Sequence, residues 1–152
     1  MTSFGHKPIA GDIPLGLPAL IEELQEQGVP LEEVYRQAKL PTSLTSASNT
    51  PLSTEMRLAL FRAARNLSMR PDTALRAGQR QKISNFGVYG FALATSPTFA
   101  QAFTFGRENI DLAGVVLRVT FERRGDVGVL MSHNPRALGD LLPFVAEFWR
   151  AS

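Results

Sequence analysis

The chain contains no cysteine and only two histidines among its 152 residues. Absence of cysteine excludes a disulfide framework, a thiolate metal site and a cysteine nucleophile, and it fits a reducing compartment such as the cytoplasm. His6 and His133 are too few for a His-rich metal site, and His133 is expected in a structural or surface role at a strand end. We therefore expect a cytoplasmic protein without metal or cofactor.

The sequence also lacks the short motifs of catalysis and phosphate binding. It contains no G-x-S-x-G, no P-loop and no G-x-G-x-x-G. The acid pair Glu122 and Asp126 flanks a predicted turn, whereas general acid–base chemistry needs carboxylates that converge in a cleft. We expect no enzyme and assign no catalytic residue.

Extremes of charge and composition are missing as well. The hydrophobic fraction is 44% and the net charge is +2, values typical of a globular chain, and the length suits one domain. No secretory signal opens the sequence. The densest basic group, Arg70, Arg76, Arg80 and Lys82, could contact phosphates, but a solvated helix end and loop is the favoured interpretation.

Charge is absent from one long tract, residues 83–106, although 20% of the chain is charged. A membrane span needs about 20 predominantly apolar residues. Pro97 breaks this tract in the middle, and polar residues and glycines interrupt it, so a span is excluded. We expect two short buried helices, or one helix and a pocket wall, with Phe91, Phe99, Phe103 and Ile110 in the core. Ser96 and Pro97 are predicted to start the second helix.

Apolar periodicity predicts helices along most of the chain. The segments with helical spacing are residues 17–27, 30–40, 54–67, 71–77, 86–95, 97–110 and, disturbed by Pro143, 135–152. In the most regular one, residues 54–67, Ser53 is the expected N-cap. Its predicted buried stripe is Met56, Leu60, Ala63, Ala64 and Leu67, and Arg57, Arg62 and Arg65 are expected to face water.

Alternating residues predict two strands, 115–122 and 127–133, each with one buried face. The intervening turn makes them an antiparallel hairpin. The polar stretch 42–50 is too short for an interdomain linker, so no boundary is placed there. The predicted fold class is α+β, with a mostly helical N-terminal part, an antiparallel β-hairpin and a C-terminal helix.

The stretch NFGVYGFALATSPTFAQAFTFG, residues 85–106, resembles the N-terminal regulatory domain of AraC-type transcriptional regulators. That family has a Gly-x-x-Gly helix with a following aromatic residue, then Ser-Pro-Thr and an Ala-rich helix before a hairpin. The matching residues are Gly87, Gly90, Phe91, Ala92, Ser96, Pro97, Thr98, Ala102 and the turn Gly125-Asp126. The upstream helices fit the family order, so the resemblance covers nearly the whole chain.

The resemblance implies a bacterial, cytoplasmic, effector-sensing and dimerising domain. Residues 1–152 would form one regulatory domain that ends before the rest of the domain and two helix-turn-helix motifs. DNA would be read only through that absent C-terminal part, with no membrane partner, and we expect a homodimer. A small-molecule effector would then bias the attached DNA-binding domain.

The glycine-rich helix is the candidate ligand site. Gly87 and Gly90 leave one helical face without side chains, which admits either a ligand or a packed helix. Aromatic residues nearby suit an apolar pocket or an ordinary core. The candidate ligand-binding residues are Phe86, Tyr89, Gly90, Phe103, Arg107 and Arg118. The two arginines could pair with a carboxylate; an amino acid, small organic acid or fatty acid effector stays open, and nothing favours a sugar.

A second hypothesis needs no ligand. The chain could be a dimerisation or protein-interaction module that uses the apolar face of its last helix, with Phe144, Phe148 and Trp149 as candidate interface residues.

Overall fold

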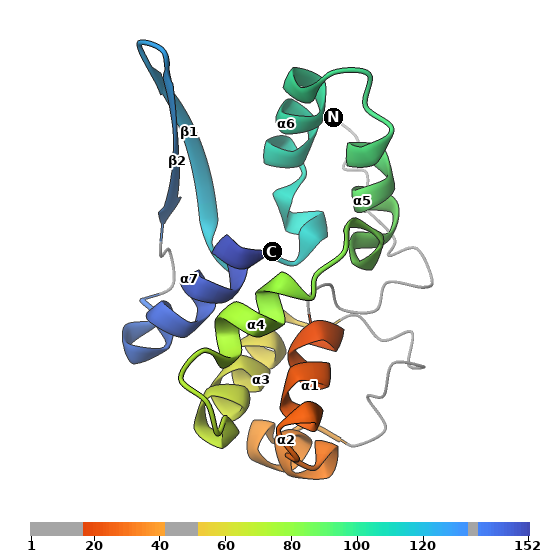
Figure 1. The fold of residues 1–152 in the computed structure, drawn as a ribbon, viewed down its shortest axis with the longest axis vertical. Coiled ribbons are helices and arrows are strands. Elements are labelled where there is room, and N and C mark those ends of the chain that lie inside the picture. The colour runs from red at the N-terminus through yellow and green to blue at the C-terminus, as the bar shows by residue number, and fades with distance from the viewer. Residues whose placement is uncertain (1–16, 42–51, 134–136) are drawn as a thin grey trace, which may run out of the picture.

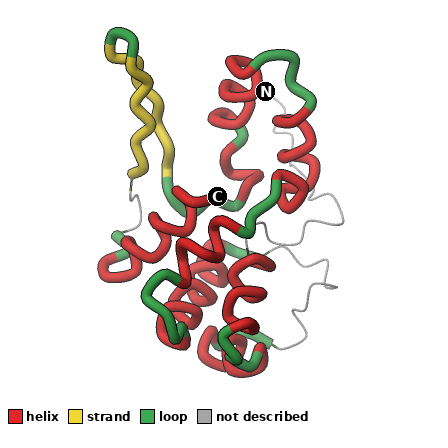
Figure 2. The backbone as a smooth tube through the Cα atoms, viewed as in Figure 1, coloured by secondary structure: helices red, strands yellow, loops and turns green. Residues whose placement is uncertain are grey.

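The computed structural model describes residues 17–41, 52–133 and 137–152, and it confirms the predicted α+β fold (Figures 1 and 2). His6 and the stretch 42–50 lie outside the described residues. The helices and strands, in chain order, are α1 (Leu17–Glu26), α2 (Leu31–Ala38), α3 (Thr54–Leu67), α4 (Thr73–Gln79), the 3-10 helix η1 (Ile83–Phe86), α5 (Gly87–Ala94), α6 (Phe99–Glu108), η2 (Ile110–Ala113), β1 (Arg118–Arg124), β2 (Val127–His133), η3 (Gly139–Leu141) and α7 (Leu142–Ala151).

A helical body made of α1 to α4 and α7 holds the hydrophobic core (Figure 1). The predicted stripes supply much of it, including Leu20 of α1 and Ala64 of α3, while Met56 and Leu67 are only partly buried. Ser53 caps α3 as predicted, because its side chain accepts a hydrogen bond from the backbone N–H of Met56 at 3.2 Å. No helix in the described part of the chain is long and apolar enough to cross a membrane.

The last helix completes this core. Pro143 lies in the first turn of α7, where its missing N–H costs no hydrogen bond, so it starts the helix and does not disturb it. Phe148 is 0% exposed, and its ring lies 5.2 Å from that of Phe61 in an edge-on contact. Phe144 and Trp149 are partly buried against the same core. Phe148 is therefore a core residue and is not available to the hypothetical interface.

Two pairs of elements project from one side of the helical body: the hairpin β1–β2 and the helices α5 and α6 (Figure 1). β1 begins at Arg118, three residues later than predicted, because Val116 and Leu117 are buried in the core of the body. Neither strand has a fully buried residue, so the expected buried face is wrong. The hairpin extends past the body and contacts α6, where the rings of Phe103 and Phe121 are 4.7 Å apart.

The uncharged tract lies outside the core, contrary to the prediction. Phe91 is 69% exposed and Phe99 is 83% exposed, while Phe103 and Ile110 are partly buried. Helix α6 starts at Phe99 with Thr98 as N-cap, since the Thr98 hydroxyl accepts from the Gln101 N–H at 3.3 Å. The predicted cap, Ser96, instead donates its hydroxyl to the carbonyl of Ala92.

A buried carboxylate joins α1 to α4. Glu23 is 0% exposed, and it accepts hydrogen bonds from Arg76 Nε at 3.0 Å and from Arg80 Nε at 2.9 Å. Gln27 donates to the same carboxylate at 3.0 Å and to the Thr73 hydroxyl at 2.9 Å. Arg76 and Arg80 are thus held in ion pairs, which removes two members of the basic group considered for phosphate contact.

The charge of Glu23 is stabilised despite its burial. Desolvation alone would raise the pKa of this carboxyl, but the hydrogen bonds from Gln27, Arg80 and Arg76 and the charge of Arg76 together hold the pKa below its ordinary value of 4.5. In the unfolded chain Glu23 has its ordinary pKa, so the unfolded state binds the proton first on acidification. The stabilisation is therefore complete above about pH 4.5 and is lost as pH falls through the lowered pKa of the folded state.

Glu23→Gln removes the charge from this network and leaves two arginines with a weaker acceptor. We expect the variant to lose about 2 kcal/mol of unfolding free energy at pH 7, the scale of a hydrogen bond to a charged group. The matched control is Glu26→Gln, which removes a pairing with the same Arg80 at a carboxylate whose side chain is 56% exposed. That change should cost less than about 1 kcal/mol.

Urea denaturation at several pH values measures both effects. The difference between the wild type and Glu23→Gln should shrink as pH falls below about 4.5, because the wild-type carboxyl then takes up a proton. Equal stability of the wild type and Glu23→Gln at pH 7 would contradict the structural role of the buried carboxylate.

Candidate functional site

A cavity of about 320 Å³ lies where the α5 region meets α7. Its volume is at the lower end for small-molecule sites. The lining comes from the segment after α4, from η1, α5 and η2, and from the end of α7. The lining residues are Gln81, Lys82, Ile83, Phe86, Tyr89, Leu93, Ile110, Ala113, Val115, Trp149 and Ser152. Two residues predicted to bind ligand, Phe86 and Tyr89, are among them.

Tyr89 fixes the position of α6 beside this cavity. Its buried hydroxyl donates to the carbonyl of Gly106 at 3.0 Å, and its ring lies 5.8 Å from that of Phe105. Burial raises the pKa of Tyr89, so the phenol stays neutral and keeps this hydrogen bond. Gly106 permits the close approach, since a Cβ there would lie 3.2 Å from the Tyr89 hydroxyl.

The two glycines of the predicted motif are needed for the local backbone conformation. Gly87 has φ +49° and ψ −134° at the junction of η1 and α5, a conformation that side chains disfavour. Gly90 is buried, and a Cβ on it would overlap the carbonyl oxygen of Ile83. Gly90 does not line the cavity; it allows η1, which carries Ile83 and Phe86, to fold back onto α5.

Two of the lining residues each have a polar atom that is buried without a hydrogen-bond partner, Gln81 Nε2 and Trp149 Nε1. Both are donors, and an unpaired buried donor costs about 1–3 kcal/mol. No sequence pattern predicts these unpaired donors, because Gln81 follows a basic segment and Trp149 is part of an apolar helical face. Trp149, the only tryptophan in the chain, is a cavity residue in the structure and not only a candidate for an interface.

A third unpaired donor lies close behind the cavity wall. Arg57 was expected to face water, but its Nε is buried and has no partner. The guanidinium packs on Gly114, where a Cβ would lie 2.8 Å from Nη1, and Gly114 stands between the lining residues Ala113 and Val115. Burial lowers the pKa of Arg57 from its ordinary value, yet a guanidinium stays charged at neutral pH. A cation therefore lies behind one wall.

The structure does not bring the other predicted ligand residues to this cavity. Phe103 packs against Phe99 and against Phe121 of the hairpin. Arg107 is exposed and lies 3.8 Å from Glu108, and Arg118 is exposed at the start of β1. The positive side chain that does line the cavity is Lys82.

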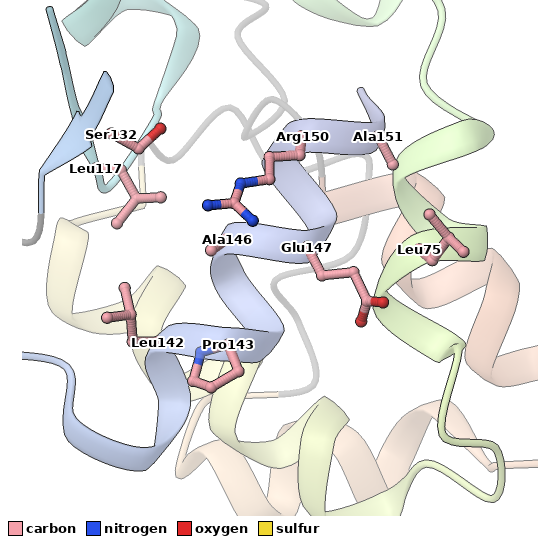
Figure 3. A pocket seen from close by; sticks show the side chains of 9 residues that line it. All are labelled: Leu75, Leu117, Ser132, Leu142, Pro143, Ala146, Glu147, Arg150 and Ala151. Carbon is pink, nitrogen blue, oxygen red and sulfur yellow. The ribbon is translucent and has the colours of Figure 1, made fainter. Parts of the chain in front are cut away.

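A second hollow, of about 630 Å³, opens over the other side of α7 (Figure 3). Figure 3 shows Arg150 extending toward Leu117 and Ser132 at the base of the hairpin, while Glu147 lies on the side of Leu75. Arg150 and Ser132 are exposed to water, so their polar groups need no ligand. The smaller cavity, which has buried unpaired donors, is the better candidate site.

No group of three or more metal-ligating side chains that could hold an ion occurs in the described ranges. His133 is exposed, and its Nε2 lies 2.6 Å from the Thr120 hydroxyl across the hairpin.

A comparison with protein-family models identifies the class of the protein. Residues 28–151 match the model described as the arabinose-binding domain of AraC transcription regulators, N-terminal. This match identifies a ligand-binding regulatory domain of a transcription regulator. The chain belongs to the family of AraC N-terminal arabinose-binding domains, as its glycine helix and hairpin indicated. No curated protein and no solved structure gave a match.

Proposed function

We propose that this chain is the effector-sensing part of a transcription regulator and that the effector binds in the 320 Å³ cavity. The observation that carries the proposal is the composition of the cavity wall. One side comes from η1, α5 and η2, which belong to the projecting part, and the other from Trp149 at the end of α7, which belongs to the helical body. A ligand there contacts both parts at once.

Such a position couples binding to domain geometry. A ligand that fits one arrangement of α5 relative to α7 better than another shifts the population toward that arrangement. An attached DNA-binding domain that senses the same arrangement is then biased by the ligand, and the two binding events are linked by a coupling free energy. Specific DNA recognition itself is assigned to that attached domain.

Val115→Phe tests the cavity, because a larger ring at this partly buried lining residue occupies ligand space. The matched control is Val127→Phe, the same substitution at an exposed residue at the start of β2. A thermal-shift screen with amino acids, organic acids, fatty acids and sugars is first run on the wild type, since a ligand of the folded state raises its melting temperature. For any compound that gives a saturable shift, the concentration needed for half of the shift should rise at least tenfold in Val115→Phe. It should be unchanged in Val127→Phe.

The reverse result would argue against the cavity: a compound that stabilises the wild type and Val115→Phe equally binds elsewhere. Circular dichroism and the melting temperature without ligand establish that Val115→Phe is folded.

We further propose that the chain self-associates, and that the surface used is the apolar face of the projecting helices. Val88, Phe91 and Phe99 are all more than 60% exposed, whereas Phe148 of the original interface hypothesis is buried. Exposed apolar side chains grouped on neighbouring helices are typical of protein interaction sites. This candidate function is compatible with effector binding, because these residues do not line the cavity.

Phe99→Ser should shift a concentration-dependent dimer toward monomer, with at least a tenfold rise in the dissociation constant measured by analytical ultracentrifugation. Met69→Ser is the control, because Met69 is 73% exposed but lies between α3 and α4 on the body. A dimer that survives Phe99→Ser and Phe91→Ser unchanged would place the interface elsewhere.

A further inference from the structure

We propose that the ligand of the 320 Å³ cavity is an apolar monocarboxylate, bound with its carboxylate toward Gln81 and Trp149 and its hydrocarbon part against the aliphatic and aromatic wall. This inference rests on the proposed function and names its ligand class. It follows from which hydrogen-bonding groups of the cavity are free, which charges surround it and how apolar its wall is.

Two of the lining residues, Gln81 and Trp149, have side-chain donors without a partner. Gln81 Nε2 and Trp149 Nε1 are buried and unpaired, and an indole N–H can only donate. A ligand that enters must supply acceptors to satisfy them. A carboxylate offers two acceptor oxygens with about four lone-pair sites, which matches two separate donors.

Three polar side chains of the lining already make hydrogen bonds within the protein. Gln81 Oε1 accepts from Asn85 at 3.4 Å, the Tyr89 hydroxyl donates to Gly106, and the Ser152 hydroxyl donates to Phe148. A sugar carries several hydroxyls, each of which must donate as well as accept. Because most of the lining is aliphatic or aromatic, several hydroxyls of a buried sugar would lack partners, at about 1–3 kcal/mol each, so the cavity disfavours a sugar.

The charges around the cavity favour an anion. Lys82 lines it, and the Arg57 guanidinium, whose Nε is buried without a hydrogen-bond partner, packs on Gly114 behind one wall. No aspartate or glutamate is among the described residues that line the cavity. An incoming carboxylate is therefore attracted, whereas an incoming ammonium group meets one cation at the wall and a second behind it.

The rest of the wall accepts a hydrocarbon. Ile83, Phe86, Leu93, Ile110 and Val115 contribute apolar side chains from four segments of the chain. Because Ile83 is exposed at the rim, a ligand chain that covers it also removes apolar surface from water. A zwitterionic amino acid would bring an ammonium group close to two cations, Lys82 and Arg57.

The test uses the fluorescence of Trp149, which reports on the cavity without interference since the chain has one tryptophan. Sodium octanoate is titrated into the protein, and octylamine, octanol and arabinose are titrated separately. We expect a saturable change with octanoate, binding at least tenfold weaker with octanol, and no saturable change with octylamine or arabinose.

Two variants assign the donors and the charge. Gln81→Met removes the amide, and Lys82→Met removes the charge at an exposed residue and so preserves folding. Each should weaken octanoate binding about tenfold and leave octanol binding unchanged. Gln79→Met on the exposed side of α4 is the matched control and should behave as the wild type.

Octanol, octylamine or arabinose binding as tightly as octanoate would overturn the ligand class, and so would the absence of any octanoate signal. The proposed function is tested independently of the ligand class. It fails if no compound of any class gives a response that Val115→Phe abolishes. A sugar that binds and is lost in Val115→Phe would therefore keep the sensor and refute the carboxylate.

Discussion

The burial of one carboxylate, Glu23, is the constraint on which the arrangement of the helices and the candidate site depend. A buried charge is tolerated only when it is paired, and Glu23 finds its partners in Arg76 of α4 and in Arg80, the residue that follows this helix. The same helix packs closely on α7, where Gly78 leaves room for the backbone of Phe148. α4 is thereby fixed between α1 and α7, and the chain that leaves it delivers Gln81 and Lys82 to the cavity.

This constraint also joins a helix outside the family match, α1, to the matched segment. The matched segment begins at residue 28, after α1, yet α1 supplies Glu23 and several residues of the same core. The first helix of this chain is therefore an integral part of the domain. On the far side, the projecting helices and the hairpin are held by a few aromatic contacts and by close approaches at Gly90 and Gly106, which suits a part that responds to a ligand.

The sequence predicted the helices, the Ser53 cap, the hairpin and two cavity residues, because each of these has a local signal. It failed where the answer depends on distant residues. Glu23 sits among other acidic residues of α1, and its partners are 53 and 57 residues away. Helix α5 is apolar on every side, so periodicity could not show which face is buried, and Phe91 was placed in the core. Trp149 looked like part of an interface because its apolar neighbours, including Phe148, form one helical face.

The indole N–H of Trp149 tests most directly whether a ligand supplies the acceptor proposed for the unpaired donors of Gln81 and Trp149. A single tryptophan gives a single indole signal in a proton–nitrogen correlation spectrum, so no assignment is needed. On addition of octanoate the account predicts a saturable downfield shift of the indole proton, as expected when a charged acceptor forms a hydrogen bond with it. An indole signal that stays in place while octanoate binds would contradict the account.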